Sequence, residues 1–146
     1  MKEVTGWKHV VQYYETDQMQ IVHHSNYIRW FEEARTWMMT DMGFSYQTME
    51  EIGVMVPVLS VNAQYKRMVT FGQTVTITAE VTQFNGVRMT LSYEVRDSET
   101  NELYCTGEST HAFLDKETYR PMSLKRSHPE LYQLYLGYLV TAEAEN

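Results

Sequence analysis

Residues 13–35 read YYETDQMQIVHHSNYIRWFEEAR, and they contain the strongest indications of the fold. The stretch begins within residues 9–15, a segment rich in Val and Tyr that predicts a first strand. Residues 16–26 interrupt that pattern and end in Ser-Asn, two residue types that commonly cap helices. Over residues 27–42 apolar side chains recur at helical spacing, and a glycine follows. The stretch therefore predicts a strand, a polar loop and a helix long enough to cross a sheet.

Strand patterns dominate the rest of the chain. Residues 54–67 are strand-like, and Pro57 near their start indicates an edge strand or a bulge. Residues 74–82 alternate between apolar and polar types, Asn85-Gly86 is a strong hairpin signal, and residues 87–95 continue the alternation. The other expected elements are a short helix at 45–52, a long strand at 103–115 and a helix at 129–140. One long helix with a mainly antiparallel five-stranded sheet predicts an α+β fold, in a single domain over residues 1–146.

Composition narrows the class of protein. The 146 residues carry 19 acidic and 12 basic side chains, a net charge of −7, which disfavours binding to nucleic acid or to an anionic membrane. The single cysteine, Cys105, allows no intrachain disulfide, and its strand-like neighbours predict a buried structural thiol. No stretch approaches the ~20 apolar residues of a membrane span, and the amino terminus lacks the apolar core of a signal peptide. We therefore expect a cytoplasmic protein.

The loop before the long helix concentrates reactive side chains. A helix amino terminus presents free N–H groups and a positive dipole end, which can stabilise an oxyanion. A nearby carboxylate such as Asp17 can attack a carbonyl or activate water, and an imidazole such as His24 can orient either. The same residue types also serve simply as caps and turn formers. A metal site using Asp17, His23 and His24 is disfavoured, because adjacent histidines diverge and no HExxH spacing occurs.

This loop, and the order of elements over nearly the whole chain, resemble the 4-hydroxybenzoyl-CoA thioesterase-like hotdog family. In that family an Asp follows the first strand, close to the amino end of a central helix; Asp17 matches it. The YbgC-type branch, which hydrolyses acyl-CoA, also has a His seven residues later and a Tyr four residues earlier, matched by His24 and Tyr13. Residues 61–67, VNAQYKR, resemble the family's second strand. The resemblance implies a hotdog fold, a long central helix wrapped by the sheet, assembled as a homodimer or homotetramer.

One position departs from the family pattern. The family usually has Gly three residues after the Asp, whereas this chain has Gln20. Because Gln does not adopt positive φ cheaply, either the loop is expected to differ or the Gly is dispensable.

The resemblance also implies a reaction, the hydrolysis of an acyl-CoA thioester to a free acid and a thiol, with no cofactor or metal. Asp17 is expected to act as nucleophile or general base, His24 to orient water or substrate, and Tyr13 to hydrogen-bond or pack. The carbonyl is expected at backbone N–H groups near His24 and Ser25. Candidate cations for the phosphates of CoA are Lys66, Arg67 and Arg88. Candidate contacts for the acyl group are Trp30, Phe31, Met55 and Val58.

Three alternatives stay open at this point. A non-catalytic acyl-binding module would keep the fold and hydrolyse nothing, a reading that Gln20 encourages. A thioesterase acting on acyl carrier protein would meet an acidic partner with an acidic surface. A hydratase or dehydratase on this fold would need Glu32 or Glu33 to face the site, but the helical pattern places both largely opposite the sheet. We further expect His23 to face away from the site and Glu15 to be solvated or ion-paired.

Overall fold

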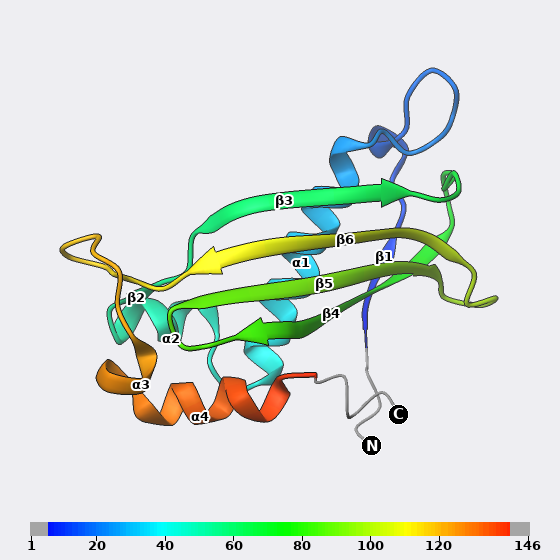
Figure 1. Ribbon diagram of the computed structural model, residues 1–146. Helices are drawn as coiled ribbons and strands as arrows, with labels where there is room; N and C mark the ends of the chain where they lie inside the picture. The colour runs from blue at the N-terminus through cyan, green and yellow to red at the C-terminus, as the bar shows by residue number, and fades with distance from the viewer. Residues whose placement is uncertain (1–5, 141–146) are drawn as a thin grey trace.

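The computed structural model of the protein describes residues 6–140. Its long helix α1 (Ser25–Asp41) crosses one face of a five-stranded sheet in which every pairing is antiparallel (Figure 1). The strand order is β1-β4-β5-β6-β3. Their bounds are Trp7–Val10 for β1, Thr74–Phe84 for β4, Arg88–Asp97 for β5, Leu103–Ala112 for β6 and Val58–Tyr65 for β3. The predicted α+β architecture is confirmed. The terminal residues 1–5, predicted to lack a signal peptide, lie outside the described part, as do residues 141–146.

The apolar stripe of α1 forms the centre of the core. Trp30, Phe31 and Ala34 are at most 1% exposed, and the Phe31 ring stacks on Tyr93 of β5 with centroids 4.5 Å apart. Gly107 of β6 allows this approach, because a Cβ there would lie 2.5 Å from the Phe31 ring. The helix therefore packs closely against the middle of the sheet.

The first strand is shorter than predicted. We expected residues 9–15 to be extended, but β1 ends at Val10 and a 3-10 helix, η1 (Tyr13–Glu15), follows. The Glu15 carboxylate accepts a hydrogen bond from the Gln12 amide at 2.8 Å, and the Tyr13 carbonyl accepts one from the Thr16 amide at 3.0 Å. These local bonds turn the chain before it enters the loop. The prediction was wrong here because Val/Tyr content says nothing of such side-chain contacts.

The predicted strand at 54–67 is two strands, β2 (Val54–Met55) and β3, with Pro57 between them. The register of β3 against β6 shifts between Val58 and Ser60, and β3 lies at the edge of the sheet. The edge position and the irregularity indicated by Pro57 are both confirmed. The Asn85-Gly86 hairpin is also present: Asn85 Oδ1 accepts hydrogen bonds from the backbone N–H groups of Val87 and Arg88, and Gly86 has φ +86°.

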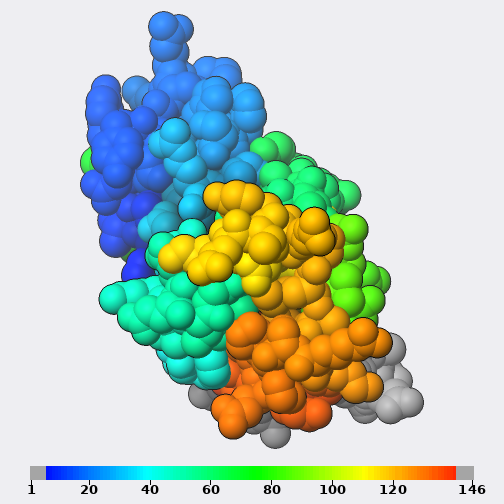
Figure 2. Space-filling model, turned by 90° about the vertical axis from the view of Figure 1, so that its left-hand side faces the viewer, coloured from blue at the N-terminus to red at the C-terminus, as the bar shows by residue number. Residues whose placement is uncertain are grey.

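The carboxy-terminal elements close the core at the end opposite the loop of residues 16–22. Figure 2 shows them (orange) beside the α2–β2 segment, with the amino-terminal part of the chain at the other end. The carboxy-terminal elements are β7 (Leu114–Asp115), which pairs with β2, α3 (Leu124–Ser127) and α4 (Pro129–Tyr138), and the neighbouring helix α2 spans Tyr46–Glu51. Cys105 is fully buried as predicted, and burial raises the pKa of its thiol to about 12. Among residues 6–140 no helix is long and apolar enough to cross a membrane.

Candidate active site

A cleft of about 750 Å³ opens where the loop of residues 16–22, the start of α1 and the end of β3 meet. Four of the predicted site residues line it: Asp17, His24, Lys66 and Arg67. They come from two segments about forty residues apart in the sequence. The fold thus brings together a carboxylate, an imidazole, the amino end of the long helix and two cations.

Asp17 lies in a tight turn within the loop. Its Oδ1 accepts a hydrogen bond from the Met19 amide at 2.8 Å, and its carbonyl accepts one from the Gln20 amide at 2.9 Å. The Asp17 amide donates to the Ile21 carbonyl at 2.9 Å. Gln20 adopts φ 67°, the left-handed conformation that favours glycine. The loop therefore forms a tight turn, and a residue with a Cβ occupies the strained position, three residues after Asp17, where the resemblance to the family leads us to expect Gly.

His24 directly precedes the first residue of α1. Its ring lies against the His23 ring, with centroids 4.1 Å apart, and its carbonyl accepts a hydrogen bond from the Tyr65 hydroxyl at 3.2 Å. Within residues 6–140 the His24 amide donates to no hydrogen-bond acceptor. An unpaired N–H at the positive end of a helix dipole is suited to a developing oxyanion. His24 thus offers two groups to the cleft, an imidazole and a backbone donor.

Two cations stand at the end of β3. Arg67 forms an ion pair with Glu102, from the connection between β5 and β6, and both residues line the cleft. The Lys66 ammonium donates to Gln64 Oε1 at 3.2 Å. Arg67 and Lys66 are exposed, so both side chains can turn to an anionic ligand. The sequence prediction missed Glu102 and Tyr65; only the position of Tyr65, next to Lys66 in the strand that resembles the family, was a signal.

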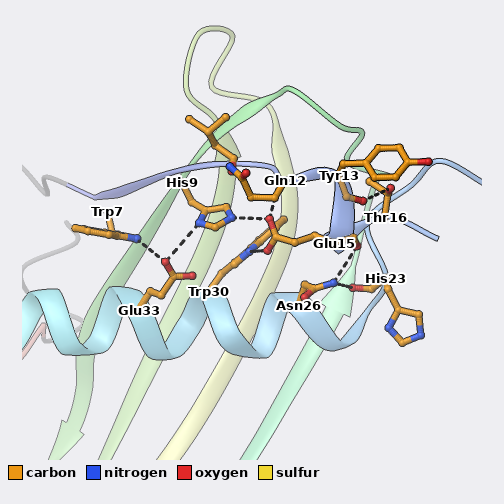
Figure 3. A network of polar contacts seen from close by, with 11 residues as sticks. Trp7, His9, Gln12, Tyr13, Glu15, Thr16, His23, Asn26, Trp30 and Glu33 are labelled. Atoms are coloured by element: carbon orange, nitrogen blue, oxygen red, sulfur yellow. Dashed lines mark hydrogen bonds and ion pairs between the residues drawn. The ribbon is translucent and has the colours of Figure 1, made fainter.

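A buried polar network lies behind the loop (Figure 3). Glu15, expected to be solvated or ion-paired, is 4% exposed and is ion-paired, with 2.7 Å from its Oε1 to His9 Nε2. Trp30 Nε1 donates to Glu15 Oε2 at 2.7 Å. Burial acts to raise the pKa of Glu15, but hydrogen bonds from His9, the Gln12 amide and Trp30 outweigh it and hold the pKa below its ordinary value. Glu15 is therefore a buried carboxylate anion, which the sequence did not predict.

Three predicted site residues lie apart from the cleft. Tyr13 is 76% exposed, and its ring meets the edge of Phe71. The Ser25 hydroxyl forms a hydrogen bond with His23 Nδ1, 2.9 Å away. Arg88 pairs with Ala112, seven residues along β6 from the Cys105 that pairs with Tyr65. At about 3.3 Å per residue this places Arg88 roughly 23 Å along the sheet, at its opposite end.

Other side chains considered from the sequence also lie elsewhere. Glu33 faces Trp7 and His9 on the outer side of α1, and Glu32 lines a separate hollow there, so neither reaches the cleft. The expected acyl contacts do not line this cleft. Trp30 and Phe31 are core residues, while Met55 in β2 and Val58 at the start of β3 lie at the end of the protein away from the cleft. His23 is exposed, as expected. Among the described residues no group of three or more His, Cys, Asp and Glu side chains could hold a metal.

The sequence profile of the thioesterase-like superfamily matches residues 11–133, which include the loop, the helix and the whole sheet beyond β1. The chain belongs to this superfamily. A putative acyl-CoA thioesterase of Bacillus subtilis, YneP, is 35% identical over 125 residues, which are 86% of this chain and 90% of the relative. The long-chain acyl-CoA thioesterase FadM of Escherichia coli is 26% identical over 115 residues, 79% of this chain and 86% of FadM.

Solved structures agree. The crystal structure of the DHNA-CoA thioesterase of Staphylococcus aureus superposes with a TM-score of 0.83 and 30% sequence identity, covering 94% of this chain and 97% of that one. The predicted hotdog fold and the prediction of a thioesterase are therefore confirmed at the level of the family.

Proposed function

We propose that this member of the superfamily hydrolyses acyl-CoA at the cleft between the 16–22 loop and the end of β3. The observation that carries the proposal is the convergence of Asp17, His24, Lys66 and Arg67 on one cleft at the positive end of α1. The relatives named as acyl-CoA thioesterases support the same substrate class.

In this proposal the thioester carbonyl lies against the free His24 amide. The amide and the helix dipole stabilise the negative charge that develops on the carbonyl oxygen. Asp17 either attacks the carbonyl carbon, forming an anhydride that water then cleaves, or takes a proton from the attacking water. In both routes the C–S bond breaks, the thiolate leaves and is protonated, and water supplies the second oxygen of the free acid. The His24 ring orients water or the substrate.

The two cations at the rim fit the nucleotide part of CoA. Arg67 and Lys66 follow directly on the edge strand, where phosphate groups of a long substrate can reach them while the thioester reaches Asp17. Arg88 has no part in this cleft.

The edge strand also supports a homo-oligomer. In β3 seven of eight side chains are exposed, among them Val58, Leu59 and Val61, each 41–49% exposed. An open edge with apolar side chains on both faces invites pairing with another strand. We propose that β3 of a second copy covers it, in a symmetric dimer or a tetramer built from such dimers. The cleft at the end of β3 then lies beside the partner subunit.

A non-catalytic module is the weaker alternative. Gln20 was its main support, but the turn around Asp17 is formed with Gln20 in place. The Asp17 carboxylate and the His24 amide therefore both remain available to a substrate.

Asp17→Asn tests the proposal, with thiol release followed for a panel of acyl-CoA chain lengths. We expect turnover by the wild type and a loss of kcat of about 100-fold or more in the variant. Asp41→Asn is the matched control, because Asp41 is an exposed carboxylate at the far end of α1, and it should keep wild-type turnover. A folded wild type that hydrolyses no acyl-CoA contradicts the proposed substrate, and turnover unchanged in Asp17→Asn contradicts the proposed site.

A further inference from the structure

The backbone of Glu15 closes the base of the loop that carries Asp17. The Glu15 carbonyl accepts hydrogen bonds from the His23 amide at 2.9 Å and from Asn26 Nδ2 at 2.9 Å. These bonds join the residue before the loop to the residues that enter α1. The separation between Asp17 and the His24 amide is therefore set by how Glu15 is held.

The side chain of Glu15 is held by three elements at once (Figure 3). Its Oε1 lies 2.7 Å from His9 Nε2 of β1. The same oxygen accepts a hydrogen bond from the Gln12 backbone N–H, at the start of η1, at 2.8 Å. Its Oε2 accepts a hydrogen bond from the Trp30 indole N–H of α1 at 2.7 Å. Trp30 is fully buried, and the Glu15 side chain is 5% exposed, so water does not replace these donors.

An ionised carboxylate satisfies this set of partners. The Gln12 amide and the Trp30 indole can only donate, and the carboxylate presents an acceptor to each. A glutamine at this position would turn its NH₂ group toward one of these donors and leave a buried donor unpaired. His9 is fixed on its far side by Glu33, 3.4 Å from His9 Nδ1, and Glu33 in turn accepts a hydrogen bond from Trp7 at 3.3 Å.

We propose that Glu15 is the positioning residue of the active site. It holds the 16–22 loop against α1 so that Asp17 lies at the working distance from the His24 amide. This inference rests on the proposed function. On its other side the loop is bonded to the connection between β3 and β4: Ile21 forms an isolated β-bridge with Thr70, and the Val22 backbone N–H donates to the Val69 carbonyl. A displacement of about 1 Å at reacting groups can cost on the order of 100-fold in rate.

The test compares Glu15→Gln with Glu32→Gln, which removes an exposed carboxylate on the outer side of α1, outside the Glu15 network. We expect Glu15→Gln to lower kcat for acyl-CoA by about 10-fold or more while KM stays within about twofold, because the binding cations are untouched. Glu32→Gln should keep the wild-type kcat. In an Asp17→Asn background, Glu15→Gln should cause almost no further loss, since its effect runs through Asp17.

A second variant covers the case in which Glu15→Gln does not fold. Trp30→Phe keeps an aromatic ring in the core and removes the donor to Glu15 Oε2, so we expect a smaller loss of kcat, of about 3- to 10-fold, again with little change in KM. Hydrogen exchange supplies a readout that needs no activity. The Asp17, Gln20 and His23 backbone amides, all bonded within the loop or to its base, should exchange faster in either variant than in Glu32→Gln.

Two results would overturn the inference. One is a folded Glu15→Gln or Trp30→Phe protein with wild-type kcat and unchanged exchange in the loop. The other is a loss in the Asp17→Asn background as large as in the wild type, which would show that Glu15 acts independently of Asp17. A wild type inactive on acyl-CoA refutes the proposed function alone, because the exchange measurement then decides the positioning role.

Discussion

Arg67, which follows β3, forms an ion pair with Glu102, which precedes β6, at the rim of the cleft that contains Asp17. The guanidinium proposed to receive the phosphates of CoA is thus already paired with a carboxylate in the free protein. A phosphate has to displace Glu102, and the repulsion between the two anions opposes binding.

Glu102→Gln should therefore improve substrate binding. An exposed ion pair contributes about 0.2–1 kcal/mol, so we expect KM for acyl-CoA to fall by up to about fivefold, and the gain to shrink in high salt. An acyl thioester of a short thiol without phosphates should show no gain. Glu99→Gln, in the same connection, changes the net charge equally and should leave KM unchanged. An equal effect of both variants would contradict a specific role of Glu102.

The left-handed conformation of Gln20 predicts that Gln20→Gly stabilises the protein. The conformation costs a residue with a Cβ roughly 1–2 kcal/mol, and part of that gain is offset by the larger freedom of glycine in the unfolded chain. We expect the free energy of unfolding in urea to rise by about 0.5–1 kcal/mol. Gln18→Gly, in the same loop at a position without positive φ, should lower it by a similar amount. Equal destabilisation by both variants would contradict the assigned strain.

The burial of His111 predicts that the protein loses stability in mild acid. His111 is fully buried in β6, with Nε2 2.7 Å from the Ser109 hydroxyl, and burial lowers its pKa to about 4. In the unfolded chain a histidine binds its proton near pH 6.5, whereas the folded protein does not until about pH 4. The unfolded state therefore gains protons first, and stability falls as the pH drops through this window, by roughly 3 kcal/mol in all.

The measurement is the free energy of unfolding of the wild type and of His111→Gln between pH 7 and pH 4. The variant should start lower and lose less stability over this range, because glutamine does not titrate. Three carboxyl groups also have a lowered pKa, but their protonation reduces stability mainly at pH values below this window: Glu15, Asp97 and Asp115. Parallel pH dependences in the two proteins would show that His111 is not the group that titrates.

The sequence predicted those parts of the fold and site that depend on local patterns. The stripe of α1 and the Asn85-Gly86 hairpin each depend on one short stretch of sequence, whereas the sequence left the form of the turn after Asp17 open because of Gln20. Asp17 and His24 could be proposed as partners because they stand seven residues apart, at the start of one helix.

Features that depend on strand register could not be predicted from the sequence. Tyr65 and Glu102 join the cleft because Tyr65 pairs with Cys105, and the same register carries Arg88 to the opposite end of the sheet. Glu15 was expected to be solvated or ion-paired, and its burial was not predicted, because carboxylates are rarely buried. Its burial depends on Trp30, which lies fifteen residues further along the chain.

The open edge of β3 predicts an obligate partner for the active site. Because the cleft begins where β3 ends, breaking the pairing of two β3 strands should lower activity as well as molecular mass. Val61→Asp places a charge in the middle of the exposed edge, and Val87→Asp, at a similarly exposed valine in the β4–β5 hairpin, is the control. We expect the wild type and Val87→Asp to sediment as a dimer or tetramer. Val61→Asp should sediment as a monomer with kcat/KM reduced at least about 10-fold. A wild type that sediments as a single active chain would refute the assembly, and a fully active Val61→Asp monomer would show that the cleft needs no partner.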